Sequence, residues 1–448
     1  MNGSRFTVTT ARAVAASCVA TALLAACGGS DTKAHDTSRV AAGDAAAAAE
    51  ACGPAGAGPP VPRGALAVVQ FGAFADSARA AGLADSLGGA GWRVAVSRDE
   101  GAAPWRVRTA PAADSAYARL VAHALRLARR PAAVVSAADE PGGGVGVVPV
   151  NRGSHGMSAR VRWTASADRC ALLVVEDPAA VEAEPVPNGF VLATERGPAL
   201  VQRDSAWDVA PSPDWTRLVY GRAFMLQGRE RDSIPAAEWA ALARRVGLDV
   251  AAVRRGAFVA SGMAVAYGVS RPVIVEVASG AERALPTTGG WRVAWTRDGG
   301  AVALGSAPSL TQDFTPPTRW DVVDAGTRAA RSASERARSL DTDVERAVVA
   351  WTDGPTIDFG VAPPRESAPI AVDGGRLESR DGWIHLTTGG GTGEAKAGRS
   401  RVVGPGVALA ATRGGGFVAA LVPDPGRREY DPPARLVVYR LPERAGGW

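Results

Sequence analysis

The tetrapeptide Ala75-Asp76-Ser77-Ala78 recurs without change as Ala113-Asp114-Ser115-Ala116, which lies 38 residues further along the chain. The same offset places Leu83 on Val121, so apolar positions that follow the two copies also coincide. An aspartate followed by apolar residues three or four apart is typical of a capped amphipathic helix. The repeat therefore predicts two helices with the same layout, each beginning at the tetrapeptide.

Runs typical of β-strands flank both predicted helices. They are rich in β-branched and aromatic residues and are bounded by glycine, proline or alanine. The four runs cover residues 66–71, 92–96, 105–109 and 132–135. Between residues 64 and 137 the predicted order is therefore β-α-β-β-α-β, an α+β domain.

The amino-acid sequence of this segment resembles that of the SPOR (sporulation-related repeat) domain. The resemblance rests on Val69-Gln70-Phe71-Gly72-Ala73-Phe74-Ala75-Asp76, on the alanine-rich helix after it, and on Pro104-Trp105-Arg106-Val107-Arg108 before the second helix. It implies an RNP-like fold whose four-stranded sheet exposes one face. SPOR domains use this face to bind peptidoglycan, preferring glycan strands stripped of their stem peptides at division sites. The resemblance thus implies peptidoglycan binding over residues 64–137.

Period-two alternation assigns the strand residues to two faces of the sheet. The apolar set, which we expect beneath the helices, is Val69, Phe71, Val94, Val96 and Val107. The polar set, which we expect on the open face, is Gln70, Arg93, Arg106 and Arg108. Amide and guanidinium groups offer donors for sugar hydroxyls, acetamido carbonyls and muramyl carboxylates. The alternative is that these side chains merely form the solvated side of a sheet.

Two positions match the residues with which SPOR domains contact glycan. Gln70 matches the glutamine of the first strand, and Trp105 matches the tryptophan that opens the third strand. Two positions depart from the pattern, because Ala73 replaces a small polar residue and Ala132-Ala133 replaces an aromatic one. Alternation also places Trp105 on the core side, so a core role for this residue stays open. The predicted glycan-binding residues are Gln70, Arg93, Trp105, Arg106 and Arg108.

The N-terminus has the features of an export signal. Arg5 and Arg12 precede an apolar stretch that ends in Leu24-Ala25-Ala26-Cys27, and this stretch is too short to span a bilayer as a mature helix. The tetrapeptide resembles the lipobox of bacterial lipoproteins, which implies cleavage after residue 26 and acylation of Cys27. An ordinary signal peptide with an incidental cysteine is the alternative. We expect a protein of the cell envelope that faces the periplasm, attached to a membrane by lipid.

Residues 27–63 are mainly Ala, Gly, Pro, Ser and Asp, a composition that cannot bury a core and predicts a flexible tether. The residue after the cysteine is Gly28 rather than the aspartate that retains some lipoproteins in the inner membrane, which favours the outer membrane. Cys52 in the tether and Cys170 beyond it would remain in an oxidising compartment. They either form a disulfide that attaches the tether to the C-terminal region or stay free.

A short sequence motif recurs in residues 158–448. This region follows a Gly- and Val-rich linker that is predicted over residues 138–157. Asp168, Asp214 and Asp298 each stand in a turn before an apolar strand, at separations of 46 and then 84 residues, the latter twice 42. Periods near this length are typical of propeller blades. The region resembles TolB-type, WD40-like propellers, which implies an all-β domain of six or seven blades. Helical insertions are predicted over 232–255 and 327–349, and a two-layer β-sandwich is the competing architecture.

Several functions find no support in the sequence. The 50 basic and 45 acidic residues are interspersed, without the basic cluster of a nucleic-acid binder. The four histidines lack metal-ligand spacing, so we predict no metal and no cofactor. The glycine-rich run 389–396 has the wrong lysine spacing for a phosphate loop. His385 has no identifiable nucleophile or carboxylate partner, and we predict that the protein is not an enzyme.

The sequence thus predicts a non-enzymatic envelope lipoprotein that binds peptidoglycan glycan strands through its SPOR-like domain. Its propeller would present a surface to an envelope protein partner. One alternative is a propeller scaffold whose SPOR-like unit no longer binds glycan. Another is a glycan-processing enzyme with its site in the propeller channel.

Overall fold

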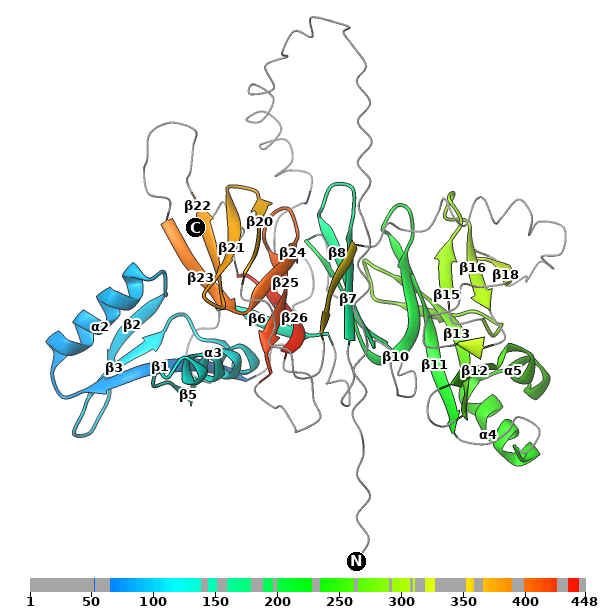
Figure 1. The fold of residues 1–448 in the computed structure, drawn as a ribbon, viewed down its shortest axis with the longest axis horizontal. Coiled ribbons are helices and arrows are strands. Elements are labelled where there is room, and N and C mark those ends of the chain that lie inside the picture. The colour runs from blue at the N-terminus through cyan, green and yellow to red at the C-terminus, as the bar shows by residue number, and fades with distance from the viewer. Residues whose placement is uncertain are drawn as a thin grey trace, which may run out of the picture. The chain divides into compact units, whose positions relative to one another are not determined.

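The computed structural model describes fifteen stretches of the chain, drawn in colour in Figure 1. They are residues 52, 65–137, 144–150, 159–178, 188–195, 200–227, 234–261, 265–289, 292–306, 309–310, 319–326, 352–357, 366–388, 399–424 and 434–442. The predicted signal peptide, Cys27 and the helical insertion predicted over 327–349 lie outside them.

The first described region is an α+β unit with the predicted order of elements, to which the structure adds a two-residue strand. Its sheet runs β2-β3-β1-β4 and β5 also pairs with β1, with every neighbouring pair antiparallel. This is the split β-α-β arrangement. The elements are β1 (Leu66–Phe74), α2 (Ser77–Gly89), β2 (Val94–Arg98), β3 (Trp105–Thr109), β4 (Ala113–Asp114), α3 (Ser115–Leu127) and β5 (Ala133–Ser136).

The repeated tetrapeptide places an N-cap at both helices. The carboxylate of Asp76 accepts a hydrogen bond from the Ala78 amide at 2.8 Å, and that of Asp114 accepts one from the Ala116 amide at 2.7 Å. Each bond satisfies one of the amides that a helix leaves unpaired at its N-terminus. The duplication seen in the sequence is therefore a duplication of helix starts.

Most of the residues predicted to lie beneath the helices do so. Val69, Phe71 and Val107 are buried in one cluster with residues of α2 and α3, and Val94 is partly buried against it. Val96 differs, since 38% of it is exposed. It lies on β2, which is the edge strand of the sheet, so there is less of the helical layer to cover it.

The rest of the described chain consists mainly of β-sheets, whose strand pairs are antiparallel apart from one short parallel pair (Figure 1). Their strands are β6 (Gly146–Pro149), β7 (Ala159–Ala165), β8 (Ala171–Pro178), β9 (Asn188–Thr194), β10 (Leu200–Pro211), β11 (Arg217–Gln227), β12 (Phe258–Ser261), β13 (Val265–Glu276), β14 (Glu282–Ala284), β15 (Arg292–Trp295), β16 (Ala301–Ser306), β17 (Ser309–Leu310), β18 (Arg319–Asp324), β19 (Thr352–Ile357), β20 (Ser367–Val372), β21 (Gly375–Arg380), β22 (Trp383–Thr388), β23 (Arg399–Pro405), β24 (Val407–Ala411), β25 (Phe417–Pro423) and β26 (Ala434–Arg440).

Three groups of three or four strands resemble the blades of a propeller, and the other ten strands described in this region form one continuous sheet. The clearest groups are β15-β16-β18, β20-β21-β22-β23 and β24-β25-β26-β6. Strand β10 joins two further groups, because its first half pairs with β9 and its second half with β11. The pattern is all-β and propeller-like.

The predicted linker over residues 138–157 contains one of these strands. Strand β6 pairs with β26, so a strand from before the domain completes the group made by the last three strands of the chain. Val147 and Val148 are both buried, which explains why this segment is part of a sheet. The all-β region therefore begins inside the segment that composition had marked as a linker.

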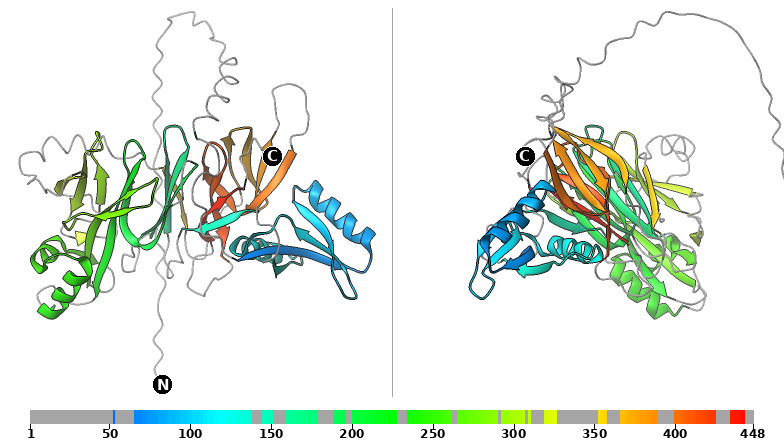
Figure 2. Two further views of the ribbon diagram at one scale, coloured as in Figure 1. Left: turned by 180° about the vertical axis from the view of Figure 1, so that it is seen from behind. Right: turned by 60° about the vertical axis from the view of Figure 1, so that its left-hand side comes forward.

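The helical insertion predicted over residues 232–255 forms two helices, α4 (Ala236–Val246) and α5 (Val250–Gly256). They stand beside β11 and β13, as the green helices of Figure 2 show. Trp239 and Leu242 are fully buried in the small core between these elements. The insertion is thus a packed addition to one sheet.

Three aspartate turns have the same internal bonding. Asp168, Asp214 and Asp298 each accept a hydrogen bond from the hydroxyl two residues before them, at 2.6, 2.6 and 2.7 Å. Each also accepts one from the amide two residues after it. The turns join β7 to β8, β10 to β11 and β15 to β16, so the repeated motif marks the same kind of turn between consecutive antiparallel strands.

A fourth copy of the turn joins β24 to β25, and its aspartate is missing. The Thr412 hydroxyl accepts a hydrogen bond from the Phe417 amide at 3.1 Å, and in the other three turns the hydroxyl likewise accepts one from the amide five residues later. Gly414, however, occupies the aspartate position. Glu195, from the turn after β9, takes the aspartate's place and accepts the Gly416 amide at 3.3 Å. A Cβ atom on Gly414 would lie 2.4 Å from a Glu195 carboxylate oxygen. The glycine therefore makes room for the carboxylate of another sheet.

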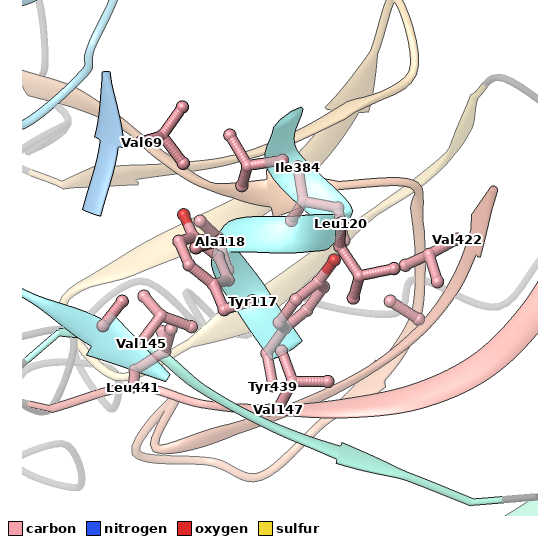
Figure 3. Packing of buried hydrophobic residues seen from close by; sticks show 14 of the residues in the cluster. Val69, Tyr117, Ala118, Leu120, Val145, Val147, Ile384, Val422, Tyr439 and Leu441 are labelled. Atoms are coloured by element: carbon pink, nitrogen blue, oxygen red, sulfur yellow. The ribbon is translucent and has the colours of Figure 1, made fainter. Parts of the chain in front are cut away.

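Helix α3 belongs to two layers at once. One side covers the sheet of the α+β unit, and the other packs on the last two strand groups, where the rings of Tyr117 and Tyr439 meet edge to face at 6.1 Å. Figure 3 shows Tyr117 and Leu120 of α3 among Ile384, Val422 and Tyr439. One continuous hydrophobic cluster thus includes the α+β unit and the propeller-like region.

Cys52 and Cys170 form a disulfide, one of the two outcomes that the sequence left open. Cys170 lies in the first aspartate turn, between β7 and β8, and both cysteines are buried. The bond attaches a residue of the predicted tether to the all-β region.

Candidate glycan-binding face

Three of the five predicted site residues gather on the face of the sheet opposite the helices. Gln70 on β1 stands directly across from Arg108 on β3, and its side-chain oxygen accepts a hydrogen bond from the Arg108 Nε atom at 3.3 Å. Arg106 follows on the same face of β3, two residues away. These side chains form a polar row across the two central strands.

A β-bulge determines which further residue joins this row. The register of β1 and β3 shifts between Gln70 and Gly72, so Ala73 rather than Gly72 pairs with Arg106. The bulge restores Ala73, three positions after Gln70, to the face that Gln70 occupies. The position that is small and polar in SPOR domains therefore lies on the candidate face, where this chain has only a methyl group.

An acid that the sequence analysis missed organises the two arginines. Asp99, in the turn between β2 and β3, lies 2.5 Å from the Arg108 guanidinium and 3.6 Å from that of Arg106. All three side chains are partly exposed, so the pairs are screened by water and contribute little to stability. Their effect is to hold the guanidiniums in place. Two cations and one anion leave this row with a positive balance.

The other half of this face is covered by the protein itself. Val68 is 1% exposed and packs with Ala112 and Ala137, from segments outside the central strands. Val68 alternates with the helix-facing Val69, so it lies on the same side of the sheet as Gln70. The accessible part of the face thus consists of the polar row and its neighbours on β2 and β5, among them the exposed Ala133, which pairs with Gln70.

Trp105 lies on the helix side of the sheet. Its ring packs against the core cluster that contains Val107, and the Arg98 guanidinium stands 5.6 Å from the ring centroid. This is the core role that alternation had left open. The structure does not bring Trp105 to the polar row.

Arg93 is also away from the polar row. It precedes β2 and lines a pocket of about 750 Å³ at the end of the sheet. The adjacent Trp92 lines the same pocket, as does Asp85 from α2. Sequence reasoning singled out Arg93 but neither neighbour, because it placed this tryptophan in a strand and gave Asp85 no role.

His385, set aside for want of a partner, has polar neighbours in the fold. Its Nδ1 atom lies 3.5 Å from the Ser400 hydroxyl, and Glu378 is its cross-strand partner on β21. Burial lowers the pKa of His385, and the nearby Arg380 lowers it further, against the opposing effect of Glu378 and Asp381. The Ser400 contact is longer than the 2.6–3.2 Å expected between a nucleophile and its base.

Two further kinds of feature are absent from the residues that the structure describes. No group of three or more His, Cys, Asp or Glu side chains in these stretches is placed to hold a metal ion. No helix in the same stretches is long and apolar enough to cross a membrane. Cys27, the predicted site of lipidation, lies outside them.

Comparison with known proteins finds likeness in folds alone. No family model matches the chain, and no curated protein matches it. Among solved structures, the β-propeller domain of the Trilobed protease from Pyrococcus furiosus has 9% identity and a TM-score of 0.18, over 66% of this chain and 69% of that one. The Pyrococcus horikoshii acylaminoacyl peptidase has 10% identity and a TM-score of 0.20, over 58% of this chain and 35% of that one.

These solved structures include a β-propeller domain. They also contradict the prediction that the protein is not an enzyme, because acylaminoacyl peptidases are among the proteins it resembles. That prediction is withdrawn. This chain spans about a third of the length of those peptidases, and at such identities and TM-scores the likeness assigns no peptidase activity to it.

Proposed function

We propose that this protein is a cell-envelope lipoprotein that binds the glycan strands of peptidoglycan through the polar row of its α+β unit. The observation that carries the proposal is the grouping of Gln70, Arg106 and Arg108 on the face of the sheet that the helices leave uncovered. The resemblance of residues 64–137 to SPOR domains supports the same ligand. The lipobox-like end of the signal sequence supports attachment of Cys27 to a membrane, with the outer membrane preferred.

The chemistry of the row suits a sugar polymer. The Nε atom of Arg108 donates a hydrogen bond to Gln70, and one terminal nitrogen donates one to Asp99. The remaining N–H donors of this guanidinium can bind a ligand. Those donors match hydroxyl, acetamido and carboxylate oxygens of a glycan strand. Because Asp99 fixes the guanidinium before the ligand arrives, little side-chain freedom remains to be lost on binding.

The test is pelleting of the full mature chain with intact and with amidase-treated sacculi. The whole chain is needed because helix α3 shares its core with the last strand groups, and a fragment of residues 64–137 would expose that core. We expect stronger binding to the amidase-treated material. Gln70→Ala should weaken it about tenfold, the effect of losing one or two hydrogen bonds.

The matched control is Arg79→Ala, which removes an exposed side chain from α2, away from the row. Equal pelleting of Gln70→Ala and Arg79→Ala would remove Gln70 from the site. Absence of pelleting by the unaltered chain would reject peptidoglycan binding as its function.

One observation favours a second candidate, a propeller scaffold whose α+β unit does not bind glycan. Both arginines of the row already have a carboxylate partner in Asp99, and Ala73 offers no polar group. In that case the propeller-like region would hold an envelope protein partner. Absence of sacculus binding, together with capture of a partner that depends on residues of the all-β region, would favour this candidate.

A further inference from the structure

The pocket at the end of the sheet is built from both layers of the α+β unit. Its walls come from the last turns of α2, from the segment that enters β2, and from the segment between β3 and β4. The lining residues are Ala84, Asp85, Gly88, Trp92, Arg93, Val94, Ala110, Pro111 and Ala112. A volume of about 750 Å³ lies within the range of small-molecule sites, which are concave and mostly apolar with a few polar groups.

The aromatic wall of this pocket is fixed in advance. The Trp92 ring meets Phe71 at 5.3 Å and Trp383 at 5.0 Å, in both cases edge to face. The preceding Gly91 accepts a hydrogen bond from the Val402 amide at 2.8 Å, and its φ of +90° suits glycine. Trp92 is therefore held from both sides, which lowers the entropic cost of binding a ligand against it.

The polar groups of the pocket carry opposite charges. Asp85 and Arg93 are both exposed, and neither forms an ion pair within the stretches that the structure describes. A carboxylate accepts hydrogen bonds from hydroxyls, and a guanidinium donates them to hydroxyl or carbonyl oxygens. Because the two charges cancel, the pocket favours a neutral ligand that is rich in hydroxyls over an anion.

We propose that this pocket binds a neutral pyranose of the N-acetylhexosamine class. Trp92 supplies an apolar surface for the C–H face of the sugar ring, while Asp85 and Arg93 form hydrogen bonds with the sugar hydroxyls. The small side chains of Ala84, Ala112 and Pro111 leave room for an acetamido methyl group. The pocket lies on a different part of the unit from the polar row that the SPOR resemblance indicates.

This inference rests on the proposed function and gives it a second point of contact. Ala95 is the residue of β2 that pairs with Arg108, and Arg93 stands two residues before it, roughly 7 Å along the strand. A glycan that crosses the polar row would have to turn round the end of the sheet to place a neighbouring sugar in the pocket, because α2 on the opposite face forms one of its walls. The row would hold the strand, and the pocket would select one neutral residue of it.

The experiment is calorimetric titration of the full mature chain with chitotetraose, a neutral oligomer of N-acetylglucosamine. Asp85→Ala and Arg93→Ala are the test variants, and both change exposed side chains, so the fold should be preserved. Arg79→Ala and Glu366→Ala are the matched controls, because each removes one exposed charge of the same sign outside the pocket. We expect each test variant to bind about tenfold more weakly and each control to bind as the unaltered chain does.

Equal affinity in all five proteins, or an equal loss in the controls, would overturn the inference. Cellotetraose, which lacks the acetamido groups, should bind more weakly than chitotetraose, and equal binding would remove the acetamido group from the assignment. Sacculus pelleting separates this inference from the function on which it rests. If Gln70→Ala weakens pelleting while the pocket variants bind both ligands normally, the proposed function stands and the pocket assignment falls.

Discussion

At the scale of single residues, the most informative pair is Glu195 and Gly414. They are far apart in sequence and together replace one aspartate of a repeated turn. In the three complete turns the residue after the aspartate has a positive φ, and Gly415 has it in the fourth. Gly414 itself is not among the positive-φ residues, so its backbone does not require glycine. What requires glycine there is the Glu195 carboxylate.

This pairing predicts a non-additive stability effect. Glu195→Ala should lower the free energy of unfolding by about 1–3 kcal/mol, since the Gly416 amide loses its acceptor. Gly414→Asp should also be destabilising, because its side chain would meet the Glu195 carboxylate. The double variant should be more stable than the sum of the single changes predicts, since the aspartate then bonds as in the other three turns. Urea unfolding of the four proteins measures this, and simple additivity would contradict it.

His385 predicts a dependence of stability on pH. Burial and Arg380 hold its pKa in the folded state below the usual value of about 6.5, so below that pH the unfolded chain binds the proton more readily. The contribution of this group is therefore complete above about pH 7 and decreases as the pH falls through about 6.5 towards the lower, folded pKa. Arg380, Glu378, Asp381 and Ser400 are the polar groups around it.

We expect His385→Asn to lose less stability than the unaltered chain when the pH is lowered from about 7.5 to about 5. Urea midpoints at both pH values provide the measurement. His123 also has a pKa lowered by burial, so the comparison must be between the two proteins at each pH rather than along one curve. Parallel curves for the two proteins would show that His385 does not titrate differently on unfolding.

At the scale of elements, the duplicated helix start permits an internal comparison. Asp76→Ala and Asp114→Ala remove the same capping bond from two helices of thirteen residues. Each should cost about 0.5–2 kcal/mol of unfolding free energy. The loss should be larger at Asp114, because its helix α3 packs on both sides and its cap is partly buried. A larger effect at Asp76, measured by urea unfolding, would contradict this reading of α3.

Element order and helix faces followed from the sequence because they depend on local spacing. Ala80 and Leu87 of α2 are buried as the 3.6-residue period indicates, and Gln70 lies on the face that alternation assigns to it. What alternation does not determine is what covers a face. Val96 is exposed at an edge strand, Val68 is covered by Ala112 and Ala137, and the bulge near Gly72 changes the partner of Arg106. These outcomes depend on contacts between distant segments.

The same limit applies to the candidate site. Residue type and alternation identified Gln70, Arg106 and Arg108, which the fold does bring together. Asp99 was missed because its role depends on the turn between β2 and β3 folding back over two arginines. The Trp92 pocket was missed because it forms only where the end of α2 meets the segments before β2 and after β3, a contact that local spacing does not specify.

At the scale of the whole molecule, the shared core around α3 joins the two regions that composition had separated. Tyr117 is fully surrounded, and burial raises its pKa far above the ordinary value for a tyrosine. The polar row is consequently carried by a unit whose helix layer is fixed against the last strand groups. A ligand bound at the polar row would therefore be attached, through the packing of α3, to the propeller-like region as well.

The disulfide extends this coupling to the predicted tether. Cys170 lies in the first aspartate turn, where Arg169 donates a hydrogen bond to Ala371 at 2.9 Å and accepts one from the Arg413 amide. The bond therefore attaches Cys52 to a corner where strands from both ends of the all-β region meet. If Cys27 carries the lipid, this corner is the part of the propeller-like region closest along the chain to the membrane.

Cys170→Ser should therefore destabilise the whole protein. The bond closes a loop across a sequence separation of 118 residues, and removing it restores conformational freedom to the unfolded chain. We expect a loss of about 2–4 kcal/mol in the free energy of unfolding, measured with urea without reductant. Cys52 should react with a maleimide in the variant, and neither cysteine should react in the oxidised, folded protein. A free thiol at Cys52 or Cys170 in the unaltered protein, or equal urea midpoints for the two proteins, would mean that the tether is not attached at this corner.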